Sequence, residues 1–251
     1  MNNGCGSDPQ SLDQVSNLLI LHPRVSRFCN PCDLTISLYD CFQFSEAPPS
    51  SVDIVFLLDT SNGVNQSDLR QQKDFVKLVA KQIGVAPNSS HAAVFSYSDK
   101  PILIGGFFDY LVGKSFEDIV DSVTLTGGKR NIQEALQSTQ RLLTSARPDV
   151  PRVVFLITYG QQARELGSQR LREMAKSVRE MRAVLYIIGV GVDDNDPQLQ
   201  PVVERQSDFF EIPSSDDLNS YVQPIAYYVV SRTGKPITTM GLRLKPPVHF
   251  N

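Results

Sequence analysis

Acidic and hydroxyl side chains gather where the first predicted strand ends, in the stretch Asp59-Thr60-Ser61-Asn62-Gly63. A carboxylate with neighbouring hydroxyls suits a hard divalent cation, which prefers oxygen ligands. A dinucleotide-binding loop would instead carry the pattern G-x-G-x-x-G, whose glycines let backbone amides approach a pyrophosphate. The stretch therefore indicates a cation site or a hydrogen-bonding site rather than a nucleotide site.

Other motifs that would bind a phosphate or a metal ion are incomplete. Gly127-Gly128-Lys129 lacks the spacing and the following Ser or Thr of a phosphate-binding loop. Asp193-x-Asn195 echoes a calcium loop, but Pro197 stands where an oxygen ligand is required. We therefore expect Asp196 to cap a helix that begins at Pro197.

The residues of nucleophilic catalysis are also missing. The chain has no G-x-S-x-G elbow, and no cysteine follows residue 41. Of the three histidines, His22 and His249 lie outside the predicted main domain, and His91 begins a strand. Without a nucleophile and base pair, the sequence predicts that the protein is not an enzyme.

All four cysteines lie in the first 41 residues, as Cys5, Cys29, Cys32 and Cys41. An even, clustered set favours two disulfides, for which three pairings are open. The alternative is a zinc site, because Cys29 and Cys32 have ligand spacing, although a second close pair is missing. The sequons at Asn65 and Asn88 are compatible with a secretory route, so we expect glycan at one of these asparagines, with Asn88 the better candidate.

The chain divides into four stretches. Residues 1–45 form a small cysteine-bearing segment, and 46–51 (E-A-P-P-S-S) form a linker, because the two prolines favour an extended chain. Residues 52–230 form the main domain. Residues 231–251 carry basic side chains and prolines without an acid, which predicts an extended tail.

Strand and helix patterns alternate along the main domain. Short apolar runs predict strands, and apolar residues at helical spacing predict helices. We expect strands at 52–58, 91–97, 102–107, 152–158, 183–190 and 209–212, and helices at 66–83, 116–123, 132–143, 168–181 and from Ser214 or Ser215 to 230. Ser67 and Asp68 are the expected caps of the first of these helices.

This alternation predicts an α/β fold, a doubly wound, Rossmann-like and mostly parallel sheet flanked by helices. Ligands of such sheets bind at the carboxyl ends of the strands, where the strand order reverses. The loops to consider are therefore 59–66, 124–131 and 158–167.

Composition narrows the class of protein. The 251 residues carry 24 Lys and Arg against 27 Asp and Glu, and 41% are hydrophobic. Such a balance is typical of a soluble globular protein and argues against nucleic-acid binding. No apolar run approaches the roughly 18–20 residues of a membrane span. The first residues lack the pattern of a secretory signal, so we expect the chain to be a fragment of a larger multidomain protein.

Five landmarks follow one another along the chain: D-I-V-F-L-L-D-T-S-N-G, then Lys73-Asp74-Phe75-Val76, then Gly127-Gly128 with Ala135-Leu136, then V-V-F-L-I-T-Y-G, then I-I-G-V-G-V. Together they closely resemble a von Willebrand factor type A domain, over about residues 51–230. The resemblance implies a binding or adhesion module. The chain looks most like the A domains of type VI collagen and related extracellular matrix proteins.

The resemblance also implies a metal-ion-dependent adhesion site at the three loops. In that family D-x-S-x-S, a Thr and the Asp of a T-D-G turn hold magnesium, and one coordination position is left for an acidic group of the partner. This chain keeps Asp59 and Ser61, but it has Gly63 for the second Ser and Tyr159 for the second Asp. The second loop offers no Thr between Gly128 and Asn131, where Asn131 alone could supply an oxygen.

Charge near Asp59 decides how these departures affect metal binding. The site keeps a single acid, and Lys129 and Arg130 bring positive charge towards it, which should weaken divalent binding. We therefore expect no cofactor and at most weak magnesium binding by a residual site of Asp59, Ser61 and Asn131. We favour the interpretation in which Asp59 and Ser61 only form hydrogen bonds, with Asp59 capping its loop or pairing with Arg130.

The leading hypothesis is a metal-independent interaction module of a secreted extracellular matrix protein, with a collagen-like or other matrix or cell-surface protein as partner. Its predicted binding face comprises Asn62, Gly63, Asn65, Lys129, Arg130, Tyr159 and Gln161. Tyrosine and arginine are favoured anchors at interfaces. The alternatives are magnesium-dependent binding through the residual site, and an intracellular scaffold whose cysteines bind zinc.

Overall fold

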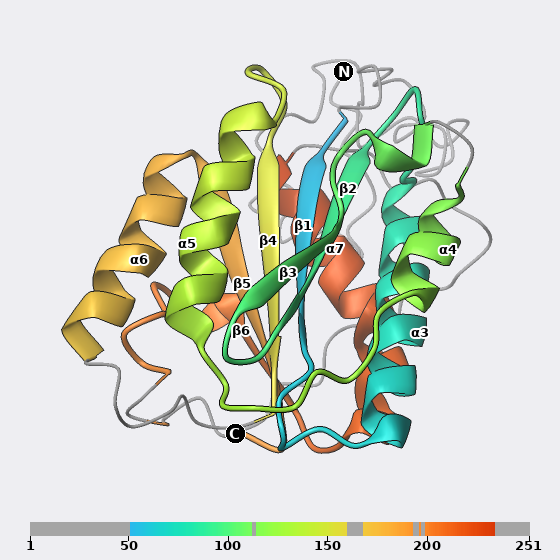
Figure 1. Cartoon of the computed structure of the whole chain (residues 1–251). Coiled ribbons are helices and arrows are strands. Elements are labelled where there is room, and N and C mark those ends of the chain that lie inside the picture. The colour runs from blue at the N-terminus through green and yellow to red at the C-terminus, as the bar shows by residue number, and fades with distance from the viewer. Residues whose placement is uncertain (1–50, 112–113, 160–167, 193–195, 197–198, 234–251) are drawn as a thin grey trace, which may run out of the picture. The chain divides into compact units, whose positions relative to one another are not determined.

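The computed structural model describes residues 51–111, 114–159, 168–192, 196 and 199–233 (Figure 1). The chain divides into two units, residues 1–48 and 49–251, and the described residues all belong to the second. The expectations for the four cysteines, for Gln161 and for the tail from residue 234 onwards therefore fall outside them.

The described residues build one six-stranded sheet in the order β3-β2-β1-β4-β5-β6. Its strands are β1 (Asp53–Asp59), β2 (His91–Tyr97), β3 (Pro101–Gly105), β4 (Arg152–Thr158), β5 (Ala183–Val190) and β6 (Phe209–Ile212). β3 runs antiparallel to β2, and every other neighbouring pair is parallel. The predicted α/β class is confirmed, and β1 lies where the strand order reverses, between β2 and β4.

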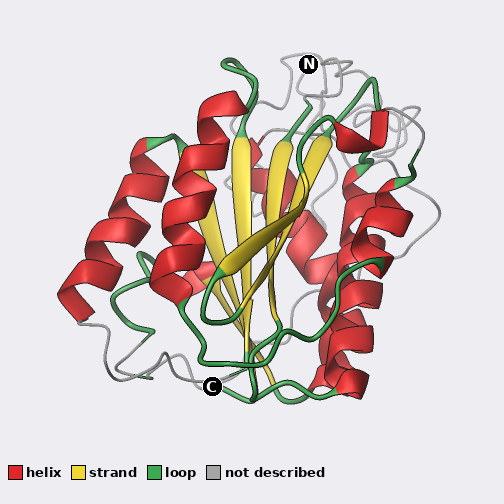
Figure 2. Ribbon diagram, viewed as in Figure 1, coloured by secondary structure: helices red, strands yellow, loops and turns green. Residues whose placement is uncertain are grey.

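Helices cover both faces of this sheet (Figure 2). One face carries α3 (Gln66–Ile83), α4 (Phe116–Asp121) and α7 (Val222–Thr233), and the other carries α5 (Ile132–Leu142) and α6 (Ser168–Glu180). Short 3-10 turns lie between the larger elements: η1 (Asp109–Leu111), η2 (Leu143–Ser145), η3 (Gln206–Asp208) and η4 (Ser215–Tyr221).

The central strands are apolar on both sides because each side faces a helical layer. Along β1, Ile54, Phe56 and Leu58 pack in the core beneath α3, whereas Val55 and Leu57 pack in the core beneath α5. Successive side chains of a strand point to opposite faces, so a strand buried twice reads as a continuous apolar run. The same arrangement recurs in β4 and β5, which explains why the sequence located these strands.

Several predicted boundaries shift. β1 extends to Asp59, so this carboxylate belongs to the end of the strand rather than to the loop. The cap of α3 is Asn65, not Ser67 or Asp68: its Oδ1 accepts the N–H groups of both residues. In return, Asp68 Oδ2 accepts the Asn65 N–H, which completes a capping box.

The carboxyl-terminal part of the domain also differs from the prediction. The expected last helix is divided into η4 and α7 and continues to Thr233, so the first residues of the predicted extended tail are helical. Residues 199–202 form turns instead of the helix expected after Asp196. None of the described helices is long and apolar enough to cross a membrane.

Candidate functional site

Three chain segments converge at the carboxyl edge of the sheet, beside the end of β1. The Thr60 carbonyl accepts N–H bonds from Thr126 and Gly127, and the Asn62 N–H donates to the Gly128 carbonyl at 3.0 Å. These bonds join the loop after β1 to the loop before α5. β4 is paired with β1 and ends at Thr158, which brings Tyr159 to the same place. The described residues of the three loops predicted from the sequence therefore meet here, the third loop being described only as far as Tyr159.

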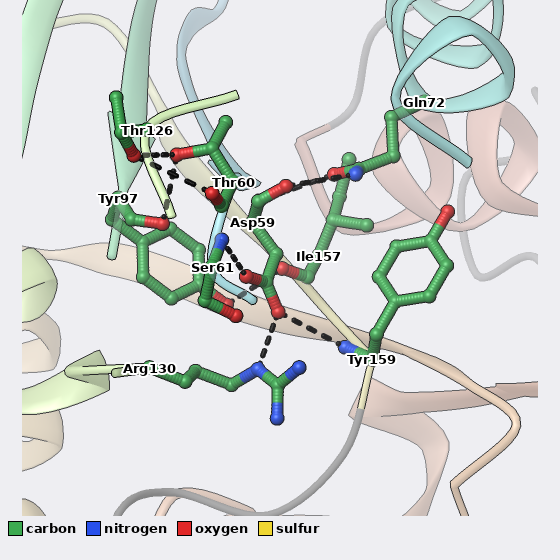
Figure 3. A network of polar contacts seen from close by, with 9 residues as sticks. All are labelled: Asp59, Thr60, Ser61, Gln72, Tyr97, Thr126, Arg130, Ile157 and Tyr159. Carbon is green, nitrogen blue, oxygen red and sulfur yellow. Dashed lines mark hydrogen bonds and ion pairs between the residues drawn. The ribbon is translucent and has the colours of Figure 1, made fainter. Parts of the chain in front are cut away.

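Asp59 is the centre of this arrangement (Figure 3). Asp59 is fully buried, yet both oxygens of its carboxylate accept hydrogen bonds. Oδ1 accepts the Ser61 N–H at 3.0 Å, and Oδ2 accepts the Tyr159 N–H at 3.3 Å and a charged hydrogen bond from Arg130 Nε. Donors from all three segments thus hold one carboxylate.

Arg130 forms an ion pair with Asp59, and only 10% of its side chain is exposed. A pair so far removed from water interacts more strongly than a surface pair, and it also carries a larger desolvation penalty. The pairing of Asp59 with Arg130, which was one of the two arrangements expected from the sequence, is the arrangement in the structure. The guanidinium brings positive charge to the carboxylate on which a divalent ion would depend.

Gln72 fixes the backbone of Asp59 from α3. Its Oε1 accepts the Asp59 N–H at 3.1 Å, and its Nε2 donates to the Asp59 carbonyl at 2.9 Å. Sequence analysis missed this residue, although a signal was present. Gln72 lies at helical spacing from Leu69, Val76 and Val79, so it is a polar residue on a buried apolar stripe, and such residues are hydrogen-bonded.

A hydroxyl network beside Asp59 was also missed. The Thr60 and Thr126 hydroxyls lie 2.7 Å apart, and Thr126 Oγ1 donates to Ser98 Oγ at 2.9 Å. Behind them, the buried Tyr97 hydroxyl donates to the Ile157 carbonyl at 2.7 Å (Figure 3). Burial raises the pKa of the Tyr97 hydroxyl well above its ordinary value. The hydroxyl bonds tie the residue after β2 and the loop before α5 to the end of β1, and the Tyr97 bond ties β2 to β4.

The second loop is held by Asn131 and Asn62, which the sequence assigned to the site, and by Asp99, which it did not. Asn131 Oδ1 accepts the Glu134 N–H at 3.1 Å, so this oxygen caps α5. Asn62 Oδ1 accepts the Gly128 N–H at 2.9 Å. Asp99, in the turn between β2 and β3, accepts the Lys129 N–H at 2.8 Å. Asn62 and Lys129 are nevertheless exposed, as are Gly63 and Asn65.

Tyr159 is half-buried rather than fully presented to solvent. Its ring packs against the core beneath α3, and its hydroxyl donates to the Asp68 carbonyl at 3.3 Å. Burial, with the negative charges of Asp68 and Asp59, raises the pKa of its hydroxyl. Tyr159 therefore connects the loop after β4 to the first turn of α3.

The donor set does not fit a divalent cation. Such an ion requires several oxygen ligands, and here both Asp59 oxygens already accept hydrogen bonds and Asn131 Oδ1 caps a helix. Gly63 has no side-chain oxygen, and a Cβ placed on it would lie 2.6 Å from Arg130 Nη2. Among the described residues, no group of three or more His, Cys, Asp or Glu side chains could hold a metal ion.

Comparison with known proteins gives the same family as the sequence motifs. The sequence model of the von Willebrand factor type A domain matches residues 53–224. The chain is 30% identical over 176 residues to the collagen alpha-4(VI) chain of Mus musculus and 25% identical over 170 residues to cuticlin-6 of Caenorhabditis elegans. These alignments cover 69% and 67% of this chain, which spans 7% and 29% of the length of those relatives.

Solved structures show the same fold. Proximal thread matrix protein 1 from the mussel byssus superimposes with a TM-score of 0.63 at 22% identity, over 71% of this chain and 46% of that one. A structure of the same mussel protein with a zinc-occupied MIDAS motif, the metal-ion-dependent adhesion site, has a TM-score of 0.62 at 24% identity, over 72% of this chain and 46% of that one. At these identities the likeness concerns the fold alone.

Proposed function

Because the chain belongs to the von Willebrand factor type A domain family, we propose that it is a non-enzymatic module that binds another protein through the carboxyl edge of its sheet without a divalent metal ion. The observation that carries this proposal is the buried ion pair between Asp59 and Arg130. A metal ion at this edge would need the Asp59 carboxylate, and the guanidinium already neutralises it.

The ion pair and its hydrogen bonds hold the edge in one arrangement without a metal. Arg130 joins the second loop to the end of β1, and the Tyr159 N–H joins the third. Residues fixed in this way present the described part of the predicted binding face with less entropy to lose on association. Its exposed members Asn62, Asn65 and Lys129 would then make most of the contacts, around the largely buried Arg130 side chain and the half-buried Tyr159. Gln161 stays part of this proposal, outside the described residues.

For the partner we infer an extracellular matrix or cell-surface protein of collagen-like type. Support comes from the relatives, which include collagen chains and cochlin. An extracellular location would favour two disulfides among the four cysteines and glycan on Asn88, which is exposed in the loop before β2. Intact mass after secretion from a eukaryotic host, with and without reduction, tests both modifications. Four free thiols or bound zinc would favour the intracellular scaffold instead.

Thermal melting of the full chain tests the metal-independent part of the proposal. We expect the same melting temperature in about 10 mM MgCl2 and in EDTA, because only a ligand that binds the folded state raises stability, by about 2.7 kcal/mol at 100 times its Kd. A shift of several degrees in magnesium would overturn the proposal and favour the magnesium-dependent alternative.

Binding measurements test the face itself. The full chain is passed over immobilised triple-helical collagen, in EDTA, and compared with the variants Lys129→Glu and Lys81→Glu. Both lysines are exposed, but Lys81 lies in the last turn of α3, at the opposite end of that helix from the site. We expect Lys129→Glu to weaken binding several-fold and Lys81→Glu to leave it unchanged. Equal effects, or binding only with magnesium, would contradict the proposed face.

A further inference from the structure

Exposed apolar side chains gather on one edge of the sheet. β3 is the edge strand and pairs with β2. Figure 2 draws no helix across it. Ile102 and Leu103 in this strand are 48% and 47% exposed, and Phe108 just beyond it is 47% exposed. In an antiparallel pair, every second residue directs its N–H and C=O away from the neighbouring strand. These main-chain groups of β3 point away from β2, so a further strand could pair with them and pack against the exposed apolar side chains.

Opposite charges flank this apolar edge. Residues 101–108 (P-I-L-I-G-G-F-F) contain no ionisable side chain, whereas Lys100 precedes them and Asp109 follows, both exposed. Asp109 Oδ2 accepts the Gly106 N–H at 2.8 Å, which keeps the carboxylate beside the end of the strand. Asp99 precedes Lys100 and is also exposed, but its Oδ1 accepts the Lys129 N–H in the loop before α5. Lys100 therefore supplies the charge at the start of the edge, and Asp109 supplies the opposite charge at its end.

A second copy of the same strand complements this pattern. If two β3 strands run antiparallel about a two-fold axis at Leu103, Lys100 of each copy lies opposite Gly106 of the other, next to the Asp109 carboxylate. Opposite charges then meet at both ends, and Ile102 faces Ile104 across the junction. A parallel arrangement would instead bring like charges together. A two-fold interface needs this kind of self-complementary surface.

We propose that β3 pairs antiparallel with β3 of a second copy of this chain, so that the two sheets continue into each other across a homodimer. The proposal does not depend on the metal-free site. Two features keep the contact short. Pro101 lacks an N–H, and the register with β2 shifts between Val94 and Phe95, which leaves Ile104 without a partner in β2. The dimer is therefore reversible and depends on concentration.

The first test measures the mass of the full chain in solution by sedimentation equilibrium, from about 10 μM to about 1 mM. We expect the average mass to rise from 27.9 kDa towards twice that value. Leu103→Lys should abolish the rise, because it places two like charges at the two-fold axis. The matched control is Leu78→Lys on α3, at a side chain that is 41% exposed, and it should dimerise normally.

Charge exchange gives a second, independent test. Lys100→Glu and Asp109→Lys should each lower dimer formation at low salt, because each places like charges opposite each other. An equimolar mixture of the two variants should dimerise again, since both contacts between unlike chains then pair opposite charges. Failure of the mixture to associate, or dimerisation of Leu103→Lys, would overturn the proposal. A chain that stays monomeric at 1 mM would also overturn the proposal. If Leu103→Lys then lowers the stability of the chain and Leu78→Lys does not, part of the same chain covers the edge.

Discussion

Asp59 and Arg130 depend on each other because both are almost withdrawn from water. Asp59 is fully buried, and its carboxylate would be costly to keep charged without a partner. The N–H groups of Ser61 and Tyr159 share in its stabilisation, and the guanidinium adds a full positive charge. Removing one member of such a buried pair lowers the free energy of unfolding more than replacing both members with well-packed uncharged side chains.

We therefore expect Arg130→Met to lower the free energy of unfolding by about 3–5 kcal/mol, because Asp59 is left charged and buried. The double variant Asp59→Asn with Arg130→Met should regain much of that loss, since an asparagine Oδ1 can still accept the Ser61 N–H. Urea denaturation of both variants and the wild type measures the difference. A loss below about 1 kcal/mol for Arg130→Met would show that the pair contributes little.

Restoring a metal site requires a change at Arg130 as well as at the positions that depart from the family pattern. Gly63→Ser with Tyr159→Asp supplies a hydroxyl and a carboxylate, but the new Cβ would lie 2.6 Å from Arg130 Nη2, and the guanidinium would still neutralise Asp59. We expect this double variant to melt at the same temperature in magnesium and EDTA. The triple variant with Arg130→Thr should melt higher in magnesium. A response from the double variant alone would mean that Arg130 leaves the site easily.

Among the secondary-structure elements, those with a strong apolar pattern were predicted best. β1, β4 and β5 are buried on both faces, so their apolar runs admit few other interpretations. The last helix was predicted too simply. Pro224 lies in the first turn of α7, where proline is tolerated because an N–H there would have no partner within the helix. The proline therefore indicates a helix that begins close before it, and in the structure α7 begins at Val222.

The site could be located from the sequence but not assembled. The strand order places Asp59 at the point of reversal, and the acid and hydroxyls there were recognised. The pairing of Asp59 with Arg130 was among the expectations, but the choice between it and a capping role depends on the course of the loop, in which Gly127 and Gly128 both have positive φ. No periodicity in the sequence encodes that course.

The start of α3 offers a prediction at this scale. Asn65 was predicted only as a glycosylated or binding residue, yet the spacing Asn65-x-x-Asp68 matches a capping box. Asn65→Ala should cost about 1 kcal/mol of unfolding free energy, whereas Asn65→Asp keeps an acceptor and should cost much less. Gln66→Ala, next to the cap, is the control. Denaturant titration measures all three, and an unchanged Asn65→Ala would show that water replaces the cap.

Across the whole domain, the central strand is anchored at both ends by a buried aspartate and an arginine. At the carboxyl end Asp59 meets Arg130, and at the amino end Asp53 accepts bonds from Arg147 Nε and Nη2 at 2.9 and 2.6 Å. The Arg147 N–H also donates to Asp53 at 2.8 Å. Between these pairs β1 is wholly apolar, so its register against β2 and β4 is fixed by charge at its ends and by packing along its length.

Alkaline pH tests how strongly the packed domain protects its tyrosines. Burial raises the pKa of Tyr110 and Tyr186 to about 12, and it also raises the pKa of Tyr97 well above its ordinary value. Above pH 10 the unfolded chain loses these protons while the folded chain keeps them, so stability is complete below pH 10 and falls as the pH rises beyond it. Tyr97→Phe should therefore lose less stability between pH 9 and 11 than the wild type, by on the order of 1 kcal/mol. The control is Phe155→Leu, which removes no titrating group and should lower stability equally at every pH. Urea unfolding at pH 9, 10 and 11 measures these slopes, and equal slopes for Tyr97→Phe and the wild type would show that Tyr97 ionises in the folded state.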